Sequence, residues 1–128
     1  MLSGTFFDIQ SFTYDNTEEV QQKLQVVVSL MGDHPIYSGH FPGNPVVPGV
    51  CQVQMVKELV EKAVKHPLNL TESDNIKFLS MINPLVNAQL EFNILIRPVI
   101  DQLLSVTATI AAGSIVFLKF KGKFKTTG

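Results

Sequence analysis

The fold of this chain is decided by residues 34–50, which read HPIYSGHFPGNPVVPGV. Prolines and glycines recur through this stretch so densely that it fits neither a helix nor a central strand. It follows the β-branched run Val26-Val27-Val28 and leads directly into a segment with helical periodicity. We therefore predict a shaped loop from Asp33 to Pro48 that holds its side chains in fixed orientations.

The residues after this loop recur with a helical period. The apolar positions that lie near one face are Val50, Val53, Val56, Val60 and Ala63, widened by Cys51, Leu59 and Val64. The charged positions on the remaining face, in the second half only, are Lys57, Glu58, Glu61, Lys62 and Lys65. Pro48 suits a first helical turn, and Pro67 is a stop. We predict a helix from about Pro48 to His66 whose first turns are enclosed by a sheet.

Six strand-like runs accompany this helix, two before it and four after it. We place them at about Gly4 to Tyr14, Glu19 to Met31, Asn75 to Ser80, Asn87 to Arg97, Gln102 to Ala112 and Ser114 to Lys125. Gly113 lies where the last two runs need a tight hairpin. This order predicts one α+β domain over residues 1–128, with a long helix packed on a curled antiparallel sheet.

Composition limits the class of protein. The 128 residues are 45% hydrophobic, enough for one core, and the formal net charge of −1 gives no reason to expect nucleic acid or an anionic membrane as a partner. Cys51, the single cysteine, fits a reducing compartment. No signal peptide and no apolar run of about 18 residues is present. We expect a cytoplasmic protein without a membrane association.

Residues 39–50 resemble the Gly-His-Phe-Pro-Gly-x-Pro-x-x-Pro-Gly-Val signature of the hot-dog-fold 3-hydroxyacyl-[acyl-carrier-protein] dehydratases. The order of elements is similar to theirs through nearly the whole chain. This resemblance implies a hot-dog fold and a dimer with the loop at its interface. It also implies an acyl-carrier-protein or CoA thioester substrate, and a homodimer, a heterodimer with a related hot-dog subunit, or a higher oligomer. We expect no cofactor and no metal.

The same resemblance implies roles for individual residues. Elimination of water from a 3-hydroxyacyl thioester needs a base, an acid and donors for the charge that develops on the thioester oxygen. By resemblance His40 is the base and the N–H of Gly49 is the oxyanion donor, while Phe41, Pro48 and Val50 contact the substrate. For His40 the alternative is a histidine held in the loop by hydrogen bonds, and we favour the catalytic role.

The acid of the resembled family lies fourteen positions after the histidine, where this chain has Gln54. An amide binds a hydroxyl but has no proton to transfer. Glu58, one helical turn later, is a candidate substitute for the acid. We favour the alternative that Glu58 is a solvated charge, paired with Lys62 or Lys65.

Two further features each have two interpretations. The lysines that alternate with Phe120, Gly122 and Phe124 are Lys119, Lys121, Lys123 and Lys125. They fit an edge strand protected from aggregation, which we favour slightly, or a docking surface for an acidic carrier protein. Met55 and Met81 fit an acyl tunnel or, more commonly, core. We interpret His34 as structural in the loop and His66 as helix-terminal.

The sequence thus predicts a dehydratase-like protein that acts on or binds acyl thioesters in fatty-acid or related lipid biosynthesis. A non-catalytic acyl-binding or heterodimer partner subunit is the first alternative. A hot-dog thioesterase is the second, because the fold hosts both chemistries. Gln54 separates the first two interpretations, because a homodimer of this chain would lack a general acid.

Overall fold

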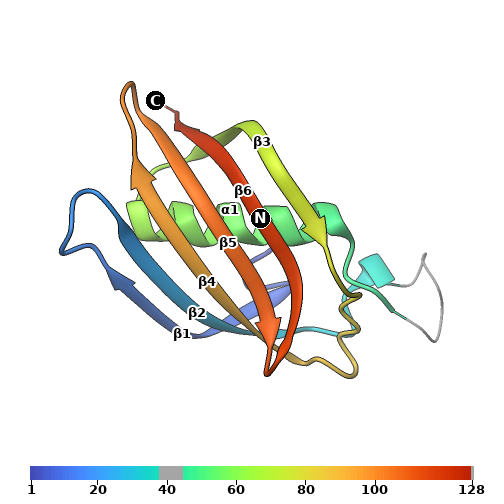
Figure 1. The fold of residues 1–128 in the computed structure, drawn as a ribbon. Helices are drawn as coiled ribbons and strands as arrows, with labels where there is room; N and C mark the ends of the chain where they lie inside the picture. The colour runs from blue at the N-terminus through green and yellow to red at the C-terminus, as the bar shows by residue number, and fades with distance from the viewer. Residues whose placement is uncertain (38–44, 128) are drawn as a thin grey trace.

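The structure is a computed structural model, and it describes residues 1–37 and 45–127. One long helix, α1 (Gly49–Val64), crosses one face of a six-stranded sheet (Figure 1). The strands are β1 (Phe7–Asp15), β2 (Gln22–Leu30), β3 (Leu68–Phe78), β4 (Gln89–Pro98), β5 (Leu103–Ala112) and β6 (Ile115–Thr126). A short 3-10 helix, η1, covers Pro35–Tyr37. This is the predicted hot-dog arrangement of a central helix wrapped by a curled sheet.

The sheet has the order β1-β2-β4-β5-β6-β3, and each neighbouring pair is antiparallel. Its central strands alternate strictly, so that one face packs on the helix and the other meets solvent. In β4, for example, Leu90, Phe92, Ile94 and Ile96 are buried, and the residues between them are exposed or partly exposed. The predicted hairpin at Gly113 is confirmed, because this glycine adopts a left-handed φ of 59° between β5 and β6.

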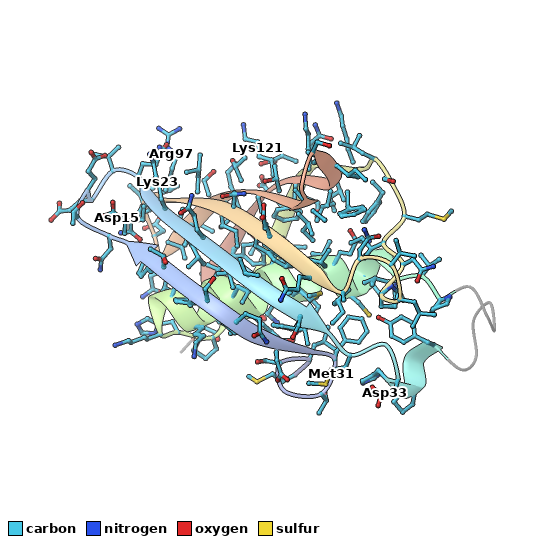
Figure 2. All side chains as sticks on the ribbon, turned by 90° about the horizontal axis from the view of Figure 1, so that it is seen from below. Asp15, Lys23, Met31, Asp33, Arg97 and Lys121 are labelled. Atoms are coloured by element: carbon cyan, nitrogen blue, oxygen red, sulfur yellow. The ribbon has the colours of Figure 1, made fainter. Side chains whose placement is uncertain are left out.

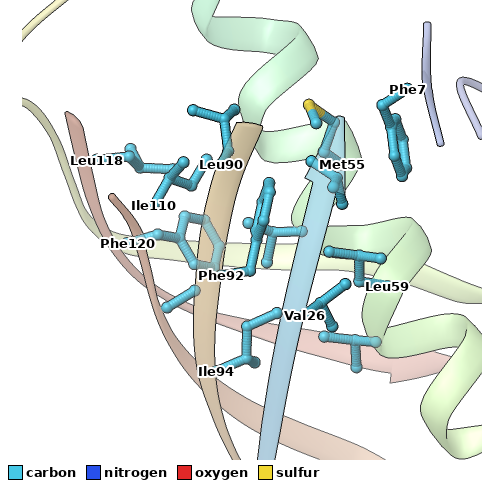
Figure 3. Close-up of a cluster of buried hydrophobic side chains, with 14 of the residues drawn as sticks. Phe7, Val26, Met55, Leu59, Leu90, Phe92, Ile94, Ile110, Leu118 and Phe120 are labelled. Atoms are coloured by element: carbon cyan, nitrogen blue, oxygen red, sulfur yellow. The ribbon is translucent and has the colours of Figure 1, made fainter. Parts of the chain in front are cut away.

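The helix packs its apolar side on the inner face of the sheet. Met55 and Leu59 point from α1 toward Val26 and Phe92, and all four side chains are at most 2% exposed (Figure 3). Pro48 is the N-cap rather than part of the first turn, and Lys65 ends the helix in a left-handed conformation. None of the helices in the described ranges combines the length and apolarity that crossing a membrane requires.

The predicted face of the helix was partly wrong. Val50 is 77% exposed, because the buried side is centred on the row that contains Gln52, Met55, Val56 and Leu59. Met55 is fully buried in this core, which confirms its interpretation as a core residue rather than a residue of an acyl tunnel. Met81, by contrast, is 76% exposed and lies in the loop after β3.

The strand after the helix is longer than predicted. β3 begins at Leu68, whereas the sequence indicated Asn75, because residues 69–75 are polar except for Leu70 and show no apolar alternation. These residues are exposed on both faces of β3, which is an edge of the sheet and pairs only with β6. Two irregularities in register, between Leu70 and Glu72 and between Ser73 and Asn75, accompany this pairing.

The interpretation of β6 as an edge strand is wrong. β6 lies between β5 and β3. Phe120, Gly122 and Phe124 are buried on its inner face, and the lysines that alternate with them lie on the face that points away from α1. Figure 2 shows Lys121 on that outer face, together with Arg97 of β4 and Lys23 of β2. Protection of a sheet edge therefore does not explain these lysines.

Candidate functional site at the start of the helix

The first turn of α1 presents backbone donors. The first N–H groups that bond back into the turn are those of Cys51 and Gln52, which donate to the carbonyl oxygen of Pro48 at 3.0 and 3.1 Å. The N–H groups of Gly49 and Val50 precede them and so have no acceptor within the helix. No side chain among the described residues caps this end, and its first turn has no acidic residue. The positive end of the helix dipole is therefore available for an oxygen with developing negative charge.

Gly49 packs closely against Phe78, at the end of β3. A β-carbon at position 49 would lie 2.7 Å from Cζ of Phe78, so any side chain here requires the ring to shift. The two residues line a cavity of about 480 Å³ with an apolar wall, which we call the Gly49 pocket. Its lining residues are Val46, Val47, Gly49, Gln52, Phe78, Leu79, Ser80 and Met81. The pocket therefore joins the helix start to an apolar loop.

Gln52 adds a buried polar group to this pocket. It is only 3% exposed, and its Nε2 donates to the carbonyl oxygen of Val47 at 3.3 Å. Its Oε1 has no hydrogen-bond partner in the part of the chain that the structure describes. A buried acceptor without a donor is costly, so a ligand N–H or O–H that reached Gln52 would be bound favourably.

Gln54 and Glu58 interact directly on the side of α1 away from Gln52. Gln54 is partly exposed, and its Nε2 donates to Oε2 of Glu58 at 2.9 Å. Glu58 is only 6% exposed, and it also accepts hydrogen bonds from the backbone N–H groups of Leu2 and Ser3. The favoured interpretation of Glu58 as a solvated charge paired with lysine is therefore wrong. Its partners are the backbone at the start of the chain and the Gln54 amide.

Tyr37 and Cys51 form a second buried polar pair next to the loop. Tyr37 is 7% exposed and stacks on Phe6 with a centroid distance of 5.7 Å. Burial, and to a lesser degree the neighbouring Cys51, raises the pKa of the Tyr37 hydroxyl well above its usual range. Burial also raises the pKa of the Cys51 thiol. Both groups are therefore neutral near pH 7, and Cys51 lacks the thiolate character that a nucleophile needs.

Two of the predicted site residues, His40 and Phe41, lie outside the described residues. The structure brings Pro48, Gly49 and Val50 together at the helix start and places Gln54 about one turn further along α1. His34 packs edge-on against Phe6 at 5.3 Å, which agrees with its structural interpretation. No group of three or more metal-ligating side chains is found in the described parts of the chain.

The family model for the ApeI dehydratase matches residues 16–104, a span that contains the loop, the helix start and β4. The chain belongs to this ApeI-like dehydratase family.

Two curated relatives of the ApeI-like chain are dehydratases. The 3-hydroxyacyl-[acyl-carrier-protein] dehydratase FabZ of Caulobacter sp. (strain K31) is 34% identical over 94 residues, which cover 73% of this chain and 53% of that protein. The FabZ of Zymomonas mobilis is 29% identical over 62 residues, which cover 48% of this chain and 39% of that protein. The chain thus spans about half the length, or less, of these relatives.

Solved structures share the fold of the ApeI-like chain at low identity. An uncharacterized protein from Erwinia carotovora has a TM-score of 0.69 at 23% identity, over 94% of this chain and 95% of that one. The dehydratase heterocomplex ApeI:P from Xenorhabdus doucetiae has a TM-score of 0.59 at 18% identity, over 88% and 94%. A putative thioesterase from Lactococcus lactis has a TM-score of 0.68 at 9% identity, over 94% and 92%.

Sequence reasoning missed Gln52, Tyr37 and Phe78 as site residues of the ApeI-like chain. Glutamine at position 52 follows no pattern that separates a buried amide from a surface one, and Phe78 reaches Gly49 only because β3 ends beside α1. Tyr37 belongs to the loop that was recognised, but its burial depends on Phe6, which is distant in sequence. Only the tertiary fold brings these residues to the helix start.

Proposed function

We propose that this chain is one subunit of a 3-hydroxyacyl thioester dehydratase, in which it supplies His40 as the base while a related hot-dog subunit supplies the acid. The observation that carries the proposal is the amide of Gln54, at the position where the resembled dehydratases have a carboxylic acid. An amide has no proton to transfer at ordinary pH. In a homodimer both sites would combine His40 with Gln54, and neither would have a general acid.

In the proposed reaction His40 removes a proton from C2 of the acyl chain, and the C–O bond at C3 breaks. The acid of the related subunit protonates the departing hydroxyl, which leaves as water. The free N–H of Gly49 would stabilise negative charge on the thioester oxygen at the positive end of α1. Phe41, Pro48 and Val50 are proposed to contact the acyl group, whose carrier is an acyl carrier protein or CoA.

The exposed edge of β3 is the proposed surface for the related subunit. β3 has eleven residues, and the side that faces away from β6 is free for a further strand in the described structure. Exposed apolar side chains, among them Phe78, Leu79 and Met81, continue from its end beside the Gly49 pocket. The ApeI:P neighbour is a heterocomplex by its description, and this supports pairing with a second hot-dog chain.

The lysines of β6 are proposed to dock an acidic carrier protein. β5 and β6 carry four lysines and no acidic residue, and the lysines share the outer face of the sheet. Lys77 of β3 is the cross-strand partner of Lys119 and adds a fifth cation to that face. Only Lys123 has an acidic partner among the described residues, Glu72 at 3.2 Å. Such a field favours a negatively charged partner and weakens with salt.

A test of docking compares the binding of an acyl group on its carrier protein with binding of the same group on CoA. We expect the double variant Lys119→Glu/Lys121→Glu to weaken binding of the carrier-linked group and to leave the CoA-linked group unaffected. Lys57→Glu/Lys62→Glu, on α1, is the control with the same change in charge. Equal effects of both variants would argue against a carrier site on β6.

A second candidate function is acyl binding without turnover. For an isolated homodimer, the missing acid at position 54 favours this function as much as it favours the need for a partner subunit. A thioesterase remains the weaker alternative. The thioesterase neighbour is only 9% identical and shares the fold alone, and the buried Cys51 is not a nucleophile in this geometry.

The decisive experiment measures dehydration of a short 3-hydroxyacyl-pantetheine thioester. The purified chain is assayed alone, and with a hot-dog dehydratase subunit that carries Glu or Asp at its acid position. We expect the chain alone to be slower by about 10²–10⁴-fold, the usual contribution of one general acid. We expect His40→Ala to abolish the activity of the mixed complex without unfolding it. Full activity of the isolated chain, unimproved by Gln54→Glu, would refute the proposal.

A further inference from the structure

The carboxylate of Glu58 is surrounded by hydrogen-bond donors. The N–H of Leu2 donates to both of its oxygens, at 2.9 and 2.8 Å, and the N–H of Ser3 donates to Oε1 at 3.0 Å. The fourth bond comes from the Gln54 amide, at 2.9 Å from Oε2. A carboxylate with this environment acts as an acceptor toward each neighbour, because backbone N–H groups only donate.

This bond decides which way the Gln54 amide faces. Oxygen and nitrogen of a carboxamide are distinguished by their hydrogen-bond partners, and an accepting carboxylate requires the NH₂ group. Residues 54 and 58 lie one turn apart on the same face of α1, a spacing at which side chains meet. The Oε1 atom of Gln54 therefore lies on the branch directed away from Glu58, and Gln54 is partly exposed there.

We infer that Glu58 is a positioning residue, which fixes the Gln54 carboxamide so that its oxygen, and not its NH₂ group, is offered to a ligand. This inference rests on the proposed function and specifies which acyl thioesters are preferred by the site that contains Gln54. The hydroxyl of a 3-hydroxyacyl chain donates a hydrogen bond to Oε1. A saturated chain has no donor at C3. A 3-oxoacyl chain has only a carbonyl oxygen there, which is an acceptor and cannot bond to the acceptor Oε1 of Gln54. The pair thus selects for a hydroxyl without supplying the proton that would remove it.

Glu61 provides a matched control on the same helix. Its Oε2 accepts a hydrogen bond from the backbone N–H of Leu68 at 2.8 Å, which resembles the anchoring of Glu58 by Leu2. No helix side chain within the described ranges bonds to Glu61, so it has no neighbour to orient. Glu61→Gln therefore repeats the chemical change, including the loss of a charge-assisted bond to a backbone N–H, without touching Gln54.

The experiment measures dissociation constants for three pantetheine thioesters of equal chain length, namely 3-hydroxyacyl, saturated and 3-oxoacyl. For the wild type we expect a preference for the 3-hydroxyacyl ligand over the saturated one of about three- to ten-fold, the worth of one neutral hydrogen bond. In Glu58→Gln the new amide offers oxygen and nitrogen alike, so the Gln54 amide loses its single orientation and the preference falls toward one. Glu61→Gln should keep the wild-type preference.

A third variant tests the inference even if Glu58→Gln proves too unstable to measure. Gln54→Met keeps the length of the side chain, removes the acceptor and leaves Glu58 bonded to Leu2 and Ser3, so it should abolish the preference in a folded protein. Thermal unfolding checks that each variant is folded. If all three ligands bind and the preference for the 3-hydroxyacyl ligand survives in Glu58→Gln and in Gln54→Met, the inference is overturned but the proposed function is not. Failure of the wild type to bind any acyl thioester would overturn the proposed function together with the inference.

Discussion

A carboxylate introduced by Gln54→Glu would meet another carboxylate. The amide that it replaces lies 2.9 Å from Glu58, and two carboxylates about 3 Å apart share one proton because both cannot ionise at that distance. Leu2 and Ser3 donate their backbone N–H groups to Glu58, so the shared proton would reside on the introduced side chain. The variant would therefore hold an acidic proton to a higher pH than a lone glutamate does.

We predict that Gln54→Glu raises the dehydration rate of the isolated chain by about 10²–10⁴-fold, the contribution of a restored general acid. Its activity should persist to a higher pH than that of Gln54→Glu/Glu58→Gln, in which the introduced carboxylate has an amide as its neighbour. The pH profile of kcat/KM for the two variants checks this. Coincident profiles would show that the side chains at positions 54 and 58 do not interact.

The buried pair Tyr37 and Cys51 predicts a loss of stability at alkaline pH. Burial raises the pKa of both groups in the folded protein above their ordinary values of 10.0 and 9.0. The folded state then binds protons that the unfolded state has released, so the stabilisation is complete below pH 9.0 and is lost as pH rises toward the folded values.

We expect the free energy of unfolding, measured by urea denaturation in steps above neutral pH, to decline from about pH 9 upward, where the unfolded thiol ionises. The decline should be shallower in Cys51→Ala, and shallower still when Tyr37→Phe is added. Tyr37→Phe alone should cost little at neutral pH, because it removes a buried hydroxyl that has no partner among the residues described. An unchanged alkaline slope in the double variant would contradict this account.

Among the elements, those with a clean period were predictable from sequence. The strands β4, β5 and β6 match their predicted ranges to within two residues at each end, because one face of each is apolar and the other polar. β3 was only half predicted, since an edge strand exposed on both faces carries no alternation. The burial of Glu58 was also missed, because its partners Leu2 and Ser3 lie more than fifty residues away in sequence.

The contact between β3 and β6 depends on Gly122. A β-carbon at this position would lie 2.6 Å from the backbone oxygen of Glu72, where the irregular part of β3 approaches β6. We predict that Gly122→Ala destabilises the fold by about 1–3 kcal/mol, because backbone rather than a flexible side chain must move. Urea denaturation measures the change.

Gly32→Ala is the control for this prediction. Its β-carbon would lie 3.2 Å from Cδ2 of Leu85, an exposed side chain that can turn away, and its backbone needs no left-handed conformation. We expect a clearly smaller effect than for Gly122→Ala. Equal effects would mean that the approach of Glu72 to β6 is not what requires a glycine.

On the scale of the whole molecule, the exposed apolar residues predict how subunits associate. Met81 and Ile100 are equally exposed, at 76%, but Met81 lies in the loop that follows β3, whereas Ile100 lies in the hairpin between β4 and β5. If pairing uses the β3 edge, Met81→Asp places a charge in the interface and should raise the dimer dissociation constant at least tenfold, equivalent to about 1.4 kcal/mol.

Ile100→Asp should leave this association unchanged. Analytical ultracentrifugation over a range of concentrations, with the chain alone and with its acid-bearing partner, compares the two variants. A monomeric wild type at micromolar concentration, or equal weakening by both variants, would exclude the β3 edge as the interface.

The family was predictable from the loop and the helix start alone, because their proline and glycine spacing is specific. The order of strands was not, because β3 joins the sheet beside β6 rather than beside β2 or β4, its neighbours in sequence. Pairing between segments this distant carries no local pattern. The position of Phe78 over Gly49 follows from that pairing and was hidden for the same reason.

The place of β3 in the sheet also sets the order in which a newly made chain completes its fold. β3 is synthesised before β4 and β5, yet its only partner in the described sheet is β6, the last strand. Contacts between such distant segments slow folding, so β3 stays unpaired until the hairpins of β4, β5 and β6 have formed. The polar run from Thr71 to Asn75 in the middle of β3 lowers the tendency of the unpaired strand to aggregate.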